Sequence, residues 1–73
     1  MPVTLDNVKE VFTYHGPSAE QTEKMEVLRE LQIALAKEIL RLVPDCADRS
    51  AALRKLREVR MDCNAAIVLN GLV

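Results

Sequence analysis

The residues best suited to chemistry in this chain are three rings that stand directly before a helix start. Phe12, Tyr14 and His15 are the only Phe, Tyr and His in its 73 residues. Shortly after them comes Ser18, with Gln21 three residues later, which is the capping-box pattern of a helix N-terminus. Such an N-terminus attracts anions through its free N–H groups. Flat rings stack on nucleobases, so this stretch is typical of a small nucleotide site.

Two cations lie further along the same expected helix. Arg29 interrupts an apolar arc, and its fork-shaped guanidinium is suited to holding a phosphate. Lys24 offers a second, more flexible cation. Rings, a helix N-terminus and an arginine on an apolar face are the parts of a nucleotide-binding site.

Structural explanations compete with this interpretation. Phe12 is typical of a core plug that anchors a short first helix, and Tyr14 and His15 could pack over the end of the hairpin. Arg29 could pair with a glutamate of another copy. Arg60 and Asn64 favour hydrogen bonds between helices or subunits over ligand contact. The basic run RKLREVR at 54–60 favours a solvated face. The pattern alone leaves these alternatives open.

The elements that must position these residues are all helical. The spacing of apolar residues, the breaks at Gly16–Pro17 and the stop at Pro44 predict helices over about 4–12, 19–43 and 46–70. Thr4 and Asp45 are the expected caps of the first and third helices, and Gly71 is the expected C-cap. No strand pattern or repeat is present. We therefore predict an all-α single domain over 1–73, with a short N-terminal helix and a long antiparallel helical hairpin.

Hydrophobic residues make up 49% of the chain, which is a large share for so small a core. On the second helix the apolar arc covers roughly half the circumference, whereas a lone hairpin needs a stripe of about 100°. Its main stripe consists of Leu28, Leu31, Leu35, Ile39 and Leu42. The corresponding stripe of the third helix consists of Leu53, Leu56, Val59, Cys63 and Ile67. The extra width predicts assembly into a homo-oligomer.

Several classes of function are disfavoured. A formal net charge of −1 gives no basic field for long nucleic acid, although residues 1–48 carry a net −4 and residues 49–73 a net +3. A single His and no Cys-x-x-Cys motif give no metal site, no cofactor and no catalytic set. Cys46 and Cys63 would lie about 25 Å apart on one helix and could not form a disulfide. With no signal peptide and no membrane-spanning run, we expect a soluble cytoplasmic protein.

Several stretches together resemble one family, the phage anti-CBASS cyclic-nucleotide sponges. They are FTYHGPSAEQ at 12–21, LRE at 28–30, a proline-containing turn at 44, RSAALRKL at 49–56 and CNAAI at 63–67. The resemblance covers about residues 11–70. Its most specific parts are the Tyr-His-x-Pro element before the capped helix and the Asn-Ala-Ala near the end of the chain.

The resemblance implies a helical hairpin that assembles into a homo-oligomer, typically a hexamer. Such proteins bind cyclic dinucleotides of the cGAMP type without cleaving them, and so protect the phage inside the infected bacterial cell. By this resemblance Tyr14 stacks on a base, while Arg29 holds a phosphate. The full set of expected ligand-binding residues is Tyr14, His15, Gly16, Pro17, Lys24, Arg29 and Asn64.

The chain also departs from the family pattern. Family members often have an aromatic residue shortly before the Asn-Ala-Ala, where this chain has Asp62. Some members bind cyclic trinucleotides at a second site built from basic residues near the chain end, whereas this chain has no cation after Arg60. The rival hypothesis is a small helical module that docks on a host protein. A helix-turn-helix DNA binder is disfavoured, because two long antiparallel helices replace the short, steeply angled pair.

Overall fold

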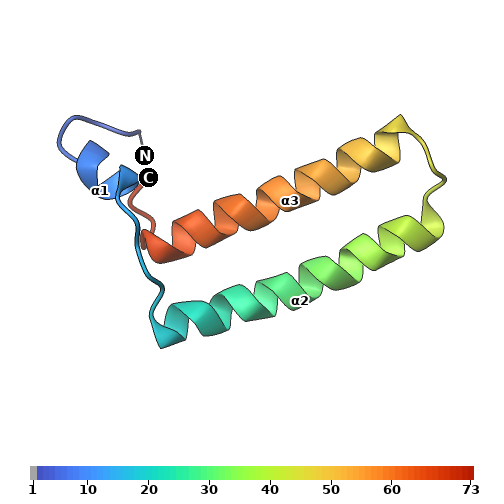
Figure 1. The fold of residues 1–73 in the computed structure, drawn as a ribbon, viewed down its shortest axis with the longest axis horizontal. Coiled ribbons are helices and arrows are strands. Elements are labelled where there is room, and N and C mark those ends of the chain that lie inside the picture. Colours follow the sequence, from blue (N-terminus) through green and yellow to red (C-terminus); the bar gives the residue numbers. More distant parts are fainter. Residues whose placement is uncertain (1) are drawn as a thin grey trace.

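The computed structural model describes residues 2–73, which form a short helix followed by a long helical hairpin (Figure 1). The helices are α1 (Val8–Phe12), α2 (Ala19–Leu42) and α3 (Ala47–Val68). α2 and α3 run antiparallel and pack along each other, while α1 lies at the end of the hairpin where α2 begins and α3 ends (Figure 1). The predicted all-α hairpin is confirmed. None of the described helices is long and apolar enough to cross a membrane.

The first helix is shorter than the predicted span of 4–12. The amide of Thr4 donates to Asn7 Oδ1 at 2.8 Å, and the amide of Asn7 donates to Thr4 Oγ1 at 3.3 Å. These two polar side chains hold residues 5–7 in a turn, and the helix proper begins only at Val8. Thr4 therefore closes a turn rather than capping a helix.

α1 does not pack closely against the hairpin. Among the described residues, α2 and α3 are the only helices whose backbones pack against each other. Phe12 is 79% exposed. The expectation that Phe12 plugs a core is therefore wrong for the single chain.

The start of α2 has the predicted capping box. The amide of Gln21 donates to Ser18 Oγ at 3.1 Å, and the amide of Ser18 donates to Gln21 Oε1 at 2.9 Å. At the other end, Val43 is extended with φ −99° and ψ 132°. A residue before proline avoids the helical region, so Pro44 ends the helix at Leu42.

The start of α3 differs from the prediction. Cys46 takes the N-cap position and makes no side-chain cap bond. The predicted cap, Asp45, instead forms an ion pair with Arg49, its Oδ1 lying 3.1 Å from a guanidinium nitrogen. Arg49 also donates to the carbonyl oxygen of Val43 at 3.4 Å. Arg49 therefore bridges the two sides of the turn and draws the Asp45 side chain away from the helix end.

The end of α3 is a Schellman motif. The amide of Asn70 donates to the carbonyl oxygen of Ile67 at 3.2 Å, and the amide of Gly71 donates to that of Ala66 at 3.0 Å. Asn70 and Gly71 both have positive φ, 52° and 73°. The left-handed position directly after the cap is thus taken by Asn70, and the predicted Gly71 occupies the next one.

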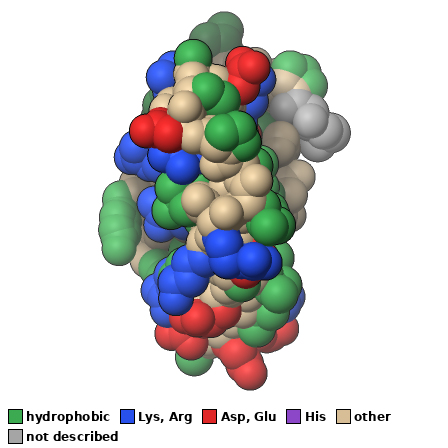
Figure 2. Space-filling model, turned by 90° about the vertical axis from the view of Figure 1, so that its right-hand side faces the viewer, with side chains coloured by type: hydrophobic (Ala, Val, Ile, Leu, Met, Phe, Trp, Pro, Cys, Tyr) green, Lys and Arg blue, Asp and Glu red, His purple; other side chains and the backbone are tan. Residues whose placement is uncertain are grey.

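No side chain of residues 2–73 is buried in the single chain. Half-buried α2 residues form one face, Gln21, Thr22, Met25, Leu28, Gln32, Ala36 and Ile39. Only part of the predicted apolar stripe of α2 belongs to this half-buried face. Leu28 and Ile39 lie on it, whereas Leu31 and Leu42 are 63% and 65% exposed. Hydrophobic side chains lie scattered among charged ones over the visible surface (Figure 2).

The hairpin is elongated, and it exposes more surface than a compact monomer. Its principal extents are 46 × 27 × 17 Å and its radius of gyration is 15.3 Å. A compact domain of this length has a radius of gyration of about 11 Å. The accessible surface is 5843 Å², against about 4,500 Å² expected from its mass.

Candidate ligand-binding site

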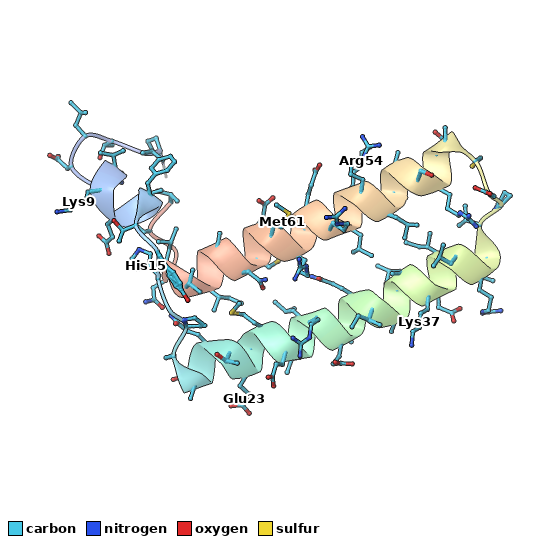
Figure 3. All side chains as sticks on the ribbon, in the orientation of Figure 1. Lys9, His15, Glu23, Lys37, Arg54 and Met61 are labelled. Atoms are coloured by element: carbon cyan, nitrogen blue, oxygen red, sulfur yellow. The ribbon has the colours of Figure 1, made fainter. Side chains whose placement is uncertain are left out.

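The connector between α1 and α2 carries four of the expected site residues in sequence, Tyr14, His15, Gly16 and Pro17. Tyr14 is 78% exposed. His15 is half-buried, and its Nε2 lies 2.6 Å from the carbonyl oxygen of Glu10. Because a carbonyl oxygen only accepts, Nε2 carries the hydrogen and donates. His15 thus ties the connector back to α1 (Figure 3), while Tyr14 beside it remains exposed.

The connector is placed against the end of α3 by the side chain of Gln21. Its Nε2 donates to the carbonyl oxygen of Ile67 at 3.0 Å and to Asn70 Oδ1 at 3.4 Å. Its Oε1 simultaneously accepts from the amide of Ser18 at 2.9 Å. One side chain therefore caps α2 and joins its first turn to the last turn of α3.

Lys24 and Asn64 lie outside this cluster of connector residues. Lys24 is mostly exposed and forms an ion pair with Glu20, with 3.7 Å between Nζ and Oε1. Such exposed ion pairs within one helix contribute little to stability. Asn64 is half-buried on α3.

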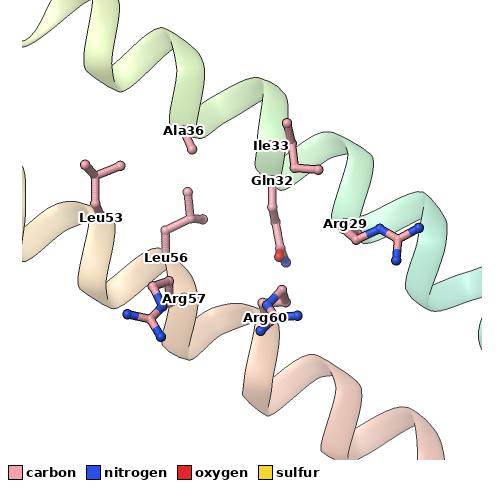
Figure 4. A pocket seen from close by; sticks show the side chains of 8 residues that line it. All are labelled: Arg29, Gln32, Ile33, Ala36, Leu53, Leu56, Arg57 and Arg60. Carbon is pink, nitrogen blue, oxygen red and sulfur yellow. The ribbon is translucent and has the colours of Figure 1, made fainter.

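Arg29 lies in a groove between the middles of α2 and α3 (Figure 4). The groove has a volume of about 270 Å³. Its lining consists of Arg29, Gln32, Ile33, Ala36, Leu53, Leu56, Arg57 and Arg60. Gln32 extends from α2 toward Arg60 on α3 (Figure 4). The groove therefore has a largely aliphatic lining to which three arginines contribute.

The structure does not bring all the expected residues into one place. Tyr14 lies before α2 begins, whereas Arg29 comes eleven residues after the Ser18 cap, about 16 Å along the helix axis. None of the other expected residues lines the groove. A single chain thus presents two separate features, a ring-bearing connector and an arginine-lined groove.

The sequence contains a signal for the groove that no single residue reveals. The sequence predicts hydrogen bonds between helices or subunits for Arg60, and it places Arg57 in a basic run typical of a solvated face. On α3, however, Leu53, Leu56, Arg57 and Arg60 are spaced by three or four residues and share one side of the helix. That spacing, set against Arg29 and Gln32 on α2, could have indicated the groove.

Comparison with known protein families identifies the hairpin. The model of the family described as "Acb2/Tad1, hairpin domain" matches residues 5–68. The chain belongs to the Acb2/Tad1 hairpin family. These proteins are phage anti-CBASS and anti-Thoeris sponges that bind cyclic-nucleotide signals without catalysis. The family resemblance predicted from the sequence is thereby confirmed. No curated protein and no solved structure matched the chain significantly.

The cyclic-nucleotide signals that the Acb2/Tad1 hairpin family binds can be compared with the two features of the molecule. A cyclic nucleotide offers flat bases and anionic phosphates within one small ligand. The connector has the only tyrosine of the chain, which is 78% exposed, and three arginines line the groove. No reacting group is required, because a sponge holds its ligand without changing it.

Proposed function

We propose that this protein sequesters cyclic dinucleotide second messengers of bacterial CBASS immunity, of the cGAMP type, inside the infected cell. By holding the messenger intact, it prevents activation of the bacterial effector. The observation that carries the proposal is the exposed Tyr14 ring on a connector that leads into a capped helix N-terminus, in a chain of the Acb2/Tad1 hairpin family.

Tyr14 is the residue that we expect to stack on a base. A tyrosine that is 78% exposed has no packing role in the single chain. Stacking of one base on an aromatic ring contributes about 1–3 kcal/mol. His15, Gly16 and Pro17 would form the wall beside it, while Lys24, Arg29 and Asn64 would contribute polar contacts.

We further propose that the protein works as a homo-oligomer, with a hexamer as the expected form. The single chain exposes roughly 1,300 Å² more surface than a compact monomer of its mass. A standard protein interface buries about 800 Å² on each partner. The excess is therefore large enough for at least one such interface, and exposed side chains such as Leu31 and Leu42 are its candidates.

Titration calorimetry against a panel of cyclic di- and trinucleotides tests the function. We expect saturable binding of a cyclic dinucleotide, with less than one ligand per chain if subunits share sites. The bound nucleotide should be recovered intact after heat denaturation of the complex. Recovery of linear dinucleotides or mononucleotides would show an enzyme instead.

The alternative is a small helical module that docks on a host protein. The exposed apolar residues of α2 favour it to the same degree, since they fit any apolar partner. It predicts no heat of binding with any member of the nucleotide panel. That result would overturn the sponge proposal for this chain.

A further inference from the structure

Three arginines that have no ion-pair partner in the single chain line the same groove. Across residues 2–73, the arginine–carboxylate ion pairs are Arg41 with Glu38 and Arg49 with Asp45. Arg29, Arg54, Arg57 and Arg60 form none, and all of these except Arg54 line the groove between α2 and α3 (Figure 4). Their charges are therefore available to an anion from outside the chain.

The groove also contains an unsatisfied hydrogen-bond acceptor. Gln32 Oε1 is shielded from solvent, and no donor within the described part of the chain reaches it. A buried polar atom without a partner costs about 1–3 kcal/mol. The remaining lining, Ile33, Ala36, Leu53 and Leu56, is aliphatic and can supply no hydrogen bond.

These requirements together describe a specific kind of occupant. It must carry negative charge that guanidinium forks can bind in two-pronged fashion, as phosphates do. It must offer an N–H group to Gln32 Oε1, and it must have a part that tolerates contact with aliphatic walls. A nucleotide has all three, in its phosphodiester, its base and its ribose.

We propose that the groove is the phosphate-binding part of the ligand site, in which Arg57 and Arg60 act together with Arg29 and Gln32 Oε1 accepts from a base N–H. This inference rests on the proposed function and adds α3 residues to the site. Connector residues 14–17 include no Lys or Arg, so they cannot neutralise the phosphates of the ligand by themselves. His15 Nε2 is already engaged with the carbonyl oxygen of Glu10.

The test compares alanine variants on α3. Arg57→Ala and Arg60→Ala each remove a groove cation, while Arg54→Ala, whose residue lies outside the groove lining on the same helix, is the matched control (Figure 3). Each protein is titrated with cGAMP at two salt concentrations, and its mass is measured by light scattering. We expect Arg57→Ala and Arg60→Ala to bind about 10- to 100-fold more weakly, with a smaller salt dependence and unchanged mass. Arg54→Ala should bind as the wild type does.

Gln32→Met provides an independent measurement. Methionine matches the length of glutamine and removes the unsatisfied oxygen, so the free variant should unfold at a higher temperature than the wild type. The same variant should bind cGAMP more weakly. A gain in stability without a loss of affinity would remove Gln32 from the site.

The outcomes separate the two proposals. Absence of wild-type binding to every nucleotide tested would overturn the proposed function itself. Normal wild-type binding with undiminished affinity of both Arg57→Ala and Arg60→Ala would overturn the groove inference alone. A fall in oligomer mass for these variants would show instead that the groove receives carboxylates of a second copy.

Discussion

Gln21 Nε2 donates a hydrogen bond to the carbonyl oxygen of Ile67 across 3.0 Å, which joins the first turn of α2 to the last turn of α3. The two residues are 46 positions apart in the chain. The same side chain accepts from the amide of Ser18 at 2.9 Å. The connector that carries Tyr14 is therefore anchored at the open end of the hairpin by one glutamine.

Two substitutions can separate the two roles of Gln21, which are capping α2 and bonding to the end of α3. Gln21→Glu keeps an oxygen for the Ser18 amide but replaces the donor to Ile67 with a carboxylate oxygen, which cannot donate. We expect it to lower the free energy of unfolding by about 1 kcal/mol or more. Gln21→Ala loses both contacts and should be at least as destabilised. Urea unfolding at one fixed protein concentration provides the measurement, because assembly makes stability depend on concentration.

Ser18→Ala is the matched control for the cap alone, with an expected loss of about 1 kcal/mol. Unchanged stability of Gln21→Glu would mean that the Gln21–Ile67 hydrogen bond does not contribute to folding. The cap would then account for the whole effect of Gln21→Ala.

The separation of Tyr14 from Arg29 along α2 predicts sites shared between subunits. A compact cyclic dinucleotide cannot touch both residues of one chain across about 16 Å of helix. Tyr14→Ala and Arg29→Ala should each weaken binding, by about 1–3 kcal/mol for the lost stacking and about 1.5–3 kcal/mol for the lost phosphate contact. Mixed and co-refolded, the two variants should regain some high-affinity sites. No recovery in subunits shown to exchange would place both residues in one chain's site.

Tyr14→Phe is the control for the ring itself. It retains the face that stacks on a base, so its affinity should remain close to that of the wild type. Full-strength binding by Tyr14→Ala would show that the pocket is wrongly placed.

Gly16 offers a substitution that separates binding from folding. A Cβ added at Gly16 would meet only the Tyr14 hydroxyl, at an ordinary contact distance of 3.9 Å, and Gly16 is not among the residues with positive φ. Gly16→Ala should therefore fold as well as the wild type or slightly better. If the ligand packs against this bare backbone, calorimetry should show a clear loss of affinity. Equal affinity would remove Gly16 from the proposed pocket.

The exposed leucines of α2 predict self-association. Light scattering at micromolar concentration should give a mass several times 8.2 kDa. Leu31→Glu places a charge where an apolar contact is expected and should lower that mass, because an unpaired carboxylate is costly to bury. Lys37→Glu, on a different side of α2, is the matched control and should assemble normally. A wild-type protein that stays monomeric would remove the basis for shared sites.

The local elements of the fold were determined by the sequence itself. Ser18 and Gln21 fix the start of α2, and Pro44 fixes its end, because caps and proline act on neighbouring backbone groups only. The connector that carries Tyr14 and His15 could also be identified from the sequence, because its rings and the helix cap that follows them are neighbours in the chain. The predicted N-cap of α3 was wrong because two local interactions competed for Asp45. Its side chain forms an ion pair with Arg49, and Cys46 occupies the N-cap position.

Only the tertiary structure decided which sides of the helices meet. A broad apolar arc permits several rotations of α2 about its axis, and the sequence did not show that Leu28 would turn toward α3 while Leu31 stayed exposed. The same rotation places Arg29 in the lining of one groove with Arg57 and Arg60. This arrangement depends on how α2 and α3 pack together, and no local pattern fixes it.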